Sequence, residues 1–173
     1  MARLRDSAGV LIGVSSLYET APVGGPEQWD YLNAVVVLDT PLSARDLLDL
    51  CLEIEQERGR ERTGPGAPRT LDLDLLVHGS VAVDEPGLTV PHPRLTERRF
   101  VLEPLVEVWG DGPVPGVADL RAALATAGDQ DVRRIAGPEW AHRRRMGAAA
   151  AATAAVLAGV SVVAGILRRR RGP

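Results

Sequence analysis

The sequence predicts an α+β domain in which a few strands and amphipathic helices share one core. Three features favour this fold class: apolar runs rich in β-branched residues, an amphipathic segment behind a capping residue, and Pro/Gly-rich segments between them. Of the 173 residues, 45% are hydrophobic and 25% are charged, which is typical of an ordered globular domain. We divide the chain into a domain over residues 1–137 and a basic, alanine-rich tail over residues 138–173.

Two apolar runs predict the first strands. Residues 10–18 are rich in β-branched side chains and lead into a Pro/Gly-rich loop at residues 20–26. Residues 31–38 form a second run, rich in Val, that ends before a proline. This run has the length of a buried strand. The domain therefore starts with a strand, a loop and a second strand.

The next segment predicts a helix between Ser43 and Gly59. Ser43 and Asp46 have the spacing of a capping box, apolar residues recur behind them at helical spacing, and Gly59 can end the helix. Cys51 lies in the apolar stripe, so we interpret it as a core residue. Glu55 lies at the edge of the stripe, where it is either a salt-bridged glutamate or a functional one.

The most informative segment is the strand Leu-Asp-Leu-Asp-Leu at residues 71–75. Alternate side chains of a strand point to opposite faces, so Asp72 and Asp74 share one face. Same-face neighbours lie about 7 Å apart, close enough to bracket one or two divalent cations that hold a nucleotide's phosphates. The guanidinium groups just upstream match phosphate oxygens; they belong to Arg58, Arg60, Arg62 and Arg69. The segment predicts a phosphoryl-transfer site made of metal ions and arginines.

Weaker signals follow this strand. Residues 78–80 predict a turn, residues 81–83 a short strand, and residues 100–105 and 117–126 two helices. His92 lies between two prolines that restrict its backbone. A histidine held near arginines can contact phosphate or serve as a structural loop residue, and the residues alone leave both interpretations open.

Composition excludes several mechanisms. All 20 basic residues are arginines, so the chain lacks the lysine of a P-loop or a Schiff base. One cysteine and three histidines do not make a zinc cluster. All 23 acidic residues lie at or before Glu139, against 13 arginines in the same stretch, which argues against nucleic-acid binding. The single cysteine suits a reducing compartment, and we expect a cytoplasmic protein.

The tail has a different pattern. Residues 147–167 contain no charged residue over 21 positions, and arginines flank them on both sides. At about 1.5 Å per residue, a helix of this length matches the hydrocarbon core of a bilayer. Nine of the 21 residues are alanines, so the segment is only weakly hydrophobic. It predicts either a transmembrane or membrane-surface helix, or a flexible or loosely helical tail.

Four ordered motifs resemble the 6-hydroxymethyl-7,8-dihydropterin pyrophosphokinase family, whose members transfer diphosphate from ATP to a pterin alcohol. The motifs are SSLYET at residues 15–20, YLNA at 31–34, RTLDLD at 69–74, and VPHPR at 90–94 with Arg98 and Phe100 behind it. An Asp-x-Asp pair alone would be weak, but four motifs at family-like spacing are specific. The resemblance implies a ferredoxin-like sandwich, with a mixed or antiparallel sheet and helices on both faces.

The resemblance also implies roles for individual residues. Asp72 and Asp74 match the pair that holds two Mg²⁺ ions on the phosphates of the co-substrate ATP. The implied catalytic residues are Arg60, Arg69, Asp72, Asp74 and His92, and the implied nucleotide-binding residues are Glu55, Arg62, Thr89 and Arg98. The implied pterin-binding residues are Thr20, Val23, Tyr31, Asn33 and Phe100, with the two aromatic rings on the faces of the pterin. Phe100 would otherwise be interpreted as a core residue. We expect a monomer that binds ATP and pterin.

Two departures from the family pattern leave alternatives open. The family has a strand and a turn ahead of the segment matching residues 10–18, so we expect the sheet to lack its first strand. A start site assigned too late or an inactive remnant would each explain this. The loop at residues 59–68 lacks a tryptophan that the family often has. The hypotheses are thus a diphosphokinase of folate biosynthesis, a non-catalytic membrane-associated protein that binds nucleotide or pterin, and, more distantly, another metal-dependent transferase.

Overall fold

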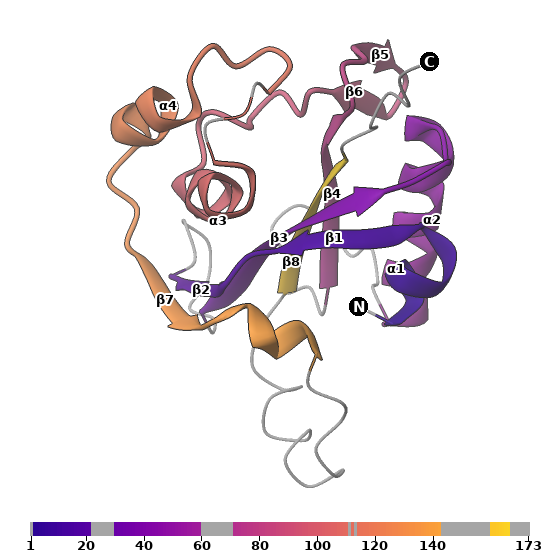
Figure 1. The fold of residues 1–173 in the computed structure, drawn as a ribbon, viewed down its shortest axis with the longest axis horizontal. Helices are drawn as coiled ribbons and strands as arrows, with labels where there is room; N and C mark the ends of the chain where they lie inside the picture. Colours follow the sequence, from indigo (N-terminus) through magenta and orange to yellow (C-terminus); the bar gives the residue numbers. More distant parts are fainter. Residues whose placement is uncertain are drawn as a thin grey trace, which may run out of the picture.

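The computed structural model describes residues 2–21, 30–59, 71–110, 112, 114–142 and 160–166, the last segment by its backbone alone. Figure 1 shows a twisted sheet with helices on both of its faces. The elements in chain order are α1 (Ala2–Ser7), β1 (Val10–Val14), β2 (Leu17–Thr20), β3 (Tyr31–Asp39), α2 (Ala44–Glu57), β4 (Leu71–His78), β5 (Val83–Glu85), β6 (Leu88–Val90), α3 (Arg99–Trp109), α4 (Leu120–Thr126), β7 (Val132–Ala136), η1 (Pro138–His142) and β8 (Val160–Ile166).

The main sheet is mixed, with the strand order β4-β8-β3-β2-β7 and with β1 also paired to β3. β1 and β2 run antiparallel to β3 along its two halves, and β7 runs antiparallel to β2. β8 lies between β3 and β4 and is parallel to both (Figure 1). β5 and β6 form a separate antiparallel hairpin. The α+β class and the mixed sheet with helices on both faces are confirmed.

The predicted strand over residues 10–18 is broken at Ser15 and Ser16. The backbone N–H of Ser15 donates to the carbonyl of Val35 at 2.9 Å, but the N–H of Val35 donates to the Ser15 hydroxyl instead of to a carbonyl. The Ser15 carbonyl accepts from the indole N–H of Trp140 at 2.9 Å. A side-chain hydroxyl has thus replaced one rung of the ladder, which ends one strand and lets the next begin.

Two apolar clusters fill the space between the sheet and its helices. One lies under α1 and α2 and includes Leu47, together with Val36 and Leu38 of β3. The other lies under α3 and α4 and includes Leu102, with Val35 of β3. Because neighbouring residues of β3 enter opposite clusters, this strand is buried on both faces, as its continuous apolar run predicts.

Most predicted helix signals are confirmed. The Ser43 hydroxyl accepts from the N–H of Asp46 at 3.1 Å, and Gly59 follows the end of α2 with a φ of +76°. The predicted helix at residues 117–126 begins only at Leu120, because Asp119 caps it by accepting from the N–H groups of the next turn. The short strand predicted at residues 81–83 begins instead at Val83. The elements α1, β6, β7 and η1 were not predicted.

The tail prediction is wrong where the structure describes it. Residues 160–166 form the strand β8, whereas a helix was predicted over residues 147–167. Four of the seven residues of β8 are Val or Ile, which favour strands. The rest of the predicted helix, residues 147–159 and 167, lies outside the described part of the chain. Within that part, no helix has the length and apolar character needed to cross a bilayer. No described strand precedes Val10, where α1 stands instead.

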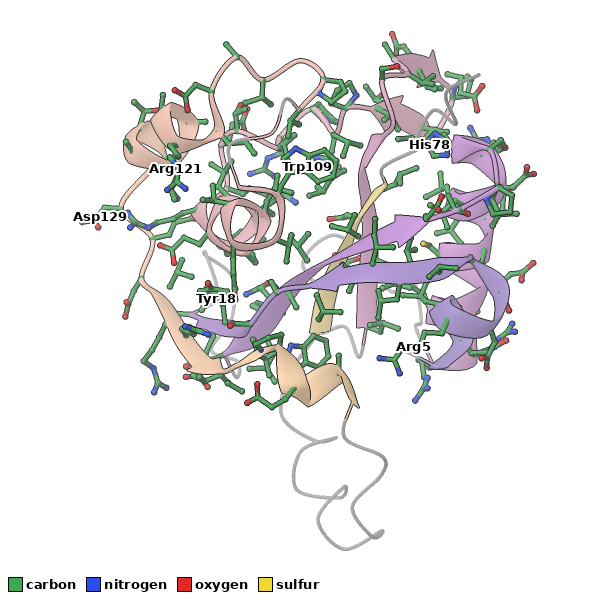
Figure 2. All side chains as sticks on the ribbon, in the orientation of Figure 1. Arg5, Tyr18, His78, Trp109, Arg121 and Asp129 are labelled. Atoms are coloured by element: carbon green, nitrogen blue, oxygen red, sulfur yellow. The ribbon has the colours of Figure 1, made fainter. Side chains whose placement is uncertain are left out.

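A partly buried polar cluster links α3 to β2 and β7. The carboxylate of Glu107 on α3 accepts from the N–H and hydroxyl of Ser16, at 2.8 and 2.7 Å, and from the Tyr18 hydroxyl at 3.0 Å. Arg134 of β7 donates to the Ser16 hydroxyl at 2.7 Å. Tyr18 lies between β2 and α3 (Figure 2). Burial and the bond to Glu107 raise the pKa of Tyr18 to about 12.

The raised pKa of Tyr18 predicts a loss of stability at high pH. The folded protein keeps the phenolic proton that the unfolded chain releases near pH 10, so this contribution is complete below about pH 10 and is lost towards pH 12. Absorbance titration of a Tyr31→Phe variant should give a tyrosine midpoint near 12. Glu107→Gln should lower that midpoint and Glu53→Gln, on the exposed side of α2, should not. A midpoint near the ordinary value of 10 in the folded protein would contradict the assignment.

Candidate active site

β4 presents its two aspartates to the α3 side of the sheet. Leu73 and Leu75 belong to the apolar cluster under α2, so the alternating residues Asp72 and Asp74 lie on the opposite face. Both aspartates are partly exposed. The alternation of leucine and aspartate thus buries one face of the strand and leaves two carboxylates accessible on the other.

Arg98 lies beside these carboxylates at the start of α3. Its guanidinium nitrogen is 3.6 Å from a carboxylate oxygen of Asp74, and the side chains are 22% and 30% exposed. Its central carbon lies 5.7 Å from the centre of the Phe100 ring, a cation–π distance. Burial, together with Arg94, lowers the pKa of Arg98, and the two aspartates oppose this shift. The group stays cationic at neutral pH, because arginine titrates far above it.

His92 is held in the segment between β6 and α3 by two hydrogen bonds. Its backbone N–H donates to the carbonyl of Leu76 at 2.8 Å, and its Nδ1 accepts from the N–H of Arg94 at 3.1 Å. Burial is the main cause that lowers the pKa of His92; Arg98 and Arg94 lower it further, against the aspartates. The imidazole is therefore neutral at pH 7 and carries its proton on Nε2, which leaves that nitrogen as a donor.

The predicted pterin residues lie at the start of β3 and the end of β2. The amide nitrogen of Asn33 donates to the hydroxyl of Thr20 at 2.9 Å, and both side chains are buried. Tyr31 is partly exposed and is paired in register with Thr20. Phe100 is partly exposed and packs against the cluster under α3. The structure thus brings Thr20, Tyr31 and Asn33 together on neighbouring strands, while Phe100 lies beside Arg98.

Glu55 is buried, unlike a carboxylate that is exposed for ligand binding. The side chain is 1% exposed, and an oxygen accepts from the backbone N–H of Leu73 at 2.6 Å. It therefore satisfies a donor on the outer edge of β4. Of the two interpretations of Glu55, the hydrogen bond supports a structural role, and a nucleotide contact stays a prediction.

Several predicted residues cannot be placed with this group. Val23, Arg60, Arg62 and Arg69 lie outside the described residues. Thr89 is exposed on β6, where its hydroxyl is 3.4 Å from a carboxylate oxygen of Asp84. His78, at the far end of β4, lies near the start of α2 (Figure 2), where its Nε2 is 3.0 Å from the carbonyl of Leu42.

One cation of the site was not predicted. Arg94 acts on both His92 and Arg98 electrostatically, and its own side chain is paired with Glu97 at 3.2 Å. The signal for it was present in the sequence, because Arg94 ends the VPHPR motif. The described cations of the site are thus Arg94 and Arg98, next to a neutral His92.

The donor set suits magnesium. No group of three or more His, Cys, Asp or Glu side chains in the described residues could hold a metal by itself. Mg²⁺ commonly takes one or two carboxylates and completes its shell with water and phosphate oxygens. Asp72 and Asp74, partly exposed on one face of β4, fit such an ion when phosphate is present.

Comparison with known proteins identifies the family. Residues 1–110 match the family model described as 7,8-dihydro-6-hydroxymethylpterin-pyrophosphokinase (HPPK). This chain belongs to the HPPK family. It is 41% identical over 127 residues to a 2-amino-4-hydroxy-6-hydroxymethyldihydropteridine pyrophosphokinase of Pseudomonas aeruginosa, a match over 73% of this chain and 78% of the relative.

Two further HPPK relatives have the same name and similar identity. The protein of Bacillus subtilis is 45% identical over 109 residues, 62% of this chain and 65% of the relative. The protein of Haemophilus influenzae is 42% identical over 105 residues, 61% of this chain and 66% of the relative. In both cases the chain spans just under two thirds of the relative's length, and the family match ends at residue 110, well before β8.

The position of Glu55 generates a prediction that separates its two interpretations. Glu55→Ala should lower the free energy of unfolding by about 1–3 kcal/mol, because the buried N–H of Leu73 loses its acceptor. Glu55→Gln keeps an acceptor and should be much less destabilising, and Glu53→Ala on the exposed side of α2 should change stability by less than about 0.5 kcal/mol. Urea denaturation measures all three. A wild-type stability for Glu55→Ala, with a raised KM for ATP, would support the nucleotide contact instead.

Proposed function

We propose that this chain transfers the diphosphate group of ATP to 6-hydroxymethyl-7,8-dihydropterin, giving AMP and the pterin diphosphate, a step of folate biosynthesis. The observation that carries the proposal is the ion pair of Arg98 with Asp74 on the face that also bears Asp72, with His92 near enough to interact electrostatically with these groups, in an HPPK-family chain. Carboxylates, a neutral imidazole and guanidinium groups together suit a metal-bound triphosphate.

In the reaction, the hydroxymethyl oxygen of the pterin attacks the β-phosphorus. The bond between this phosphorus and the oxygen bridging to the α-phosphate breaks, AMP leaves with that oxygen, and the hydroxyl proton passes to solvent. Asp72 and Asp74 would hold Mg²⁺, which, when bound, offsets the negative charge of the transferred group. The described residues contribute by alignment and by donating hydrogen bonds, which lowers the barrier without a covalent intermediate.

His92 and Arg98 of the described site can donate to phosphate oxygens. The Nε2–H of His92 is a neutral donor, since Nδ1 already accepts from Arg94. Arg98 offers a cation that is partly paired with Asp74 and is supported on the Phe100 ring. Phosphate contacts by Arg60, Arg62 and Arg69, and nucleotide contacts by Glu55 and Thr89, are part of the proposal.

The pterin would bind where β2 and β3 adjoin. Asn33 can read the polar edge of the ring with its amide oxygen, while Thr20 holds the amide in place through the 2.9 Å bond. The rings of Tyr31 and Phe100 offer stacking surfaces, and Val23 belongs to the same proposed pocket. Because the Thr20–Asn33 pair is buried and already bonded, the edge-reading group is held in one orientation before the ligand arrives.

Four finer points remain predictions: two Mg²⁺ ions, a monomer, a cytoplasmic location, and contact of the tail with a membrane. The strand β8 removes seven residues from the span suggested for that contact. The non-catalytic alternative has no observation in its favour in the described residues.

Replacing either aspartate should abolish most turnover. Asp72→Asn and Asp74→Asn keep the size of the side chain but remove a negative metal ligand, and each should lower kcat at least about 100-fold. The measurement is AMP formation from ATP, Mg²⁺ and hydroxymethyl-dihydropterin, alongside thermal unfolding to establish that the variants fold.

Asp49→Asn provides a matched control, because Asp49 is exposed on α2, 4.0 Å from Arg45 and outside the site. This variant should keep the wild-type rate. Near-wild-type rates for both Asp72→Asn and Asp74→Asn would remove the metal assignment, and a wild-type chain that forms no AMP would remove the proposed activity.

A further inference from the structure

The C-terminal strand β8 lies between β3 and β4 in the main sheet. All seven of its residues are paired in register with β3 on one side and with β4 on the other. β4 has no other partner in the main sheet of the described residues. The family match covers residues 1–110 and leaves this strand unassigned.

Two backbone groups of β4 have partners outside the main sheet. The N–H of Leu73 donates to Glu55, and the carbonyl of Leu76 accepts from the N–H of His92. The backbone groups that point inward have β8 as their partner. Without β8, the inner edge of β4 and the facing edge of β3 would both carry unpaired polar groups next to an apolar core, which is costly.

The two apolar clusters also favour a strand between β3 and β4. Val36 of β3 and Leu75 of β4 belong to the cluster under α2, and Val35 and Leu76 belong to the cluster under α3. These strands lie two strand spacings apart, about 9–10 Å, because β8 stands between them. The composition Val-Ser-Val-Val-Ala-Gly-Ile, without charge or proline, is typical of a strand buried on both faces.

β8 also sets the distance between the two parts of the proposed site. Asn33 of β3 and Asp72 of β4 are both in register with Ser161, and Val35 and Asp74 are both in register with Val163. Register partners share one face of a sheet. The strand that carries the pterin-edge residue and the strand that carries the carboxylates are therefore spaced by a segment of the tail.

We propose that residues 160–166 of the tail are an integral central strand of the catalytic domain, bound within the same chain and parallel to β3 and β4, and that they hold the Asn33 strand at a fixed distance from the Asp72 and Asp74 strand. The placement goes beyond the proposed function and is tested without activity. Only its consequence for catalysis rests on that function.

Disulfide trapping in the full chain tests the placement. In a Cys51→Ala background, Ala34→Cys combined with Val162→Cys joins register partners and should oxidise rapidly to an intramolecular disulfide. Trypsin cleaves after arginine, so the product should be a disulfide-linked pair of peptides, residues 6–45 with residues 146–168. Mass spectrometry before and after reduction identifies this pair.

Two matched pairs control for register and direction. Ala34→Cys with Val163→Cys is shifted by one residue, which turns the second thiol to the other face, so it should crosslink at least about tenfold more slowly. In the parallel arrangement, Leu32→Cys and Ile166→Cys place the two thiols at opposite ends of the strands. In an antiparallel arrangement the same two thiols would lie close together. Equal rates for the shifted pair, crosslinking of the antiparallel pair alone, or linkage only between two copies would each overturn the proposal.

Activity measurements test separately whether β8 supports catalysis. Val162→Pro removes a ladder donor and should abolish AMP formation, whereas Val162→Ile should keep it, and Ala150→Pro, outside β8, should also keep it. The disulfide-trapped Ala34→Cys/Val162→Cys protein should remain active, with KM values close to those before oxidation. Full activity of Val162→Pro, or loss of activity on trapping, would overturn the role in the site. If the wild-type chain is inactive, the proposed function fails while the trapping result still decides the placement.

Discussion

The structure depends on β4, because each side of this one strand makes a different kind of interaction. Leu73 and Leu75 join the core under α2, and Asp72 and Asp74 lie on the face of the site. The outer edge is capped by hydrogen bonds to Glu55 and from His92, and the inner edge is paired with β8. Because the same backbone serves the core, the site and the sheet, the carboxylates cannot move without disturbing all three.

Charged groups of the proposed site pair with one another. Arg98 is paired with Asp74, and Arg94 is paired with Glu97. Burial, with a smaller contribution from these two arginines, lowers the pKa of His92 against the pull of the aspartates. A triphosphate adds further negative charge to a surface that already holds two carboxylates. Coulomb repulsion in this partly buried place would disfavour binding unless divalent cations and additional guanidinium groups arrive with the nucleotide. Such cations would allow an acidic strand to belong to the proposed phosphate site.

Local signals were predictable where one segment determines its own structure. The cap at Ser43, the stop at Gly59 and the alternation along β4 all follow from neighbouring residues. The strand break at Ser15 does not follow from neighbouring residues, because the Ser15 hydroxyl bonds to Val35 and the Ser15 carbonyl bonds to Trp140, 125 positions away. Glu55 could be placed at the edge of its helix, but its bond to Leu73 depends on how α2 packs on β4. Roles such as those of Asn33 and Phe100 came from the family resemblance and not from local pattern.

The tail shows most clearly where prediction from local sequence fails. An uncharged run of 21 residues, weakly hydrophobic because nine of them are alanines, does not determine whether the segment enters a bilayer or a protein core. A membrane helix satisfies its own backbone within the segment. A central strand satisfies two neighbouring edges in addition to its own groups, so its stability depends on what those neighbours lack. β3 and β4 belong to distant parts of the sequence, and only their arrangement in the sheet creates the paired edges that residues 160–166 fill. The preference for a strand here is therefore a property of the assembled fold, which no window along the chain contains.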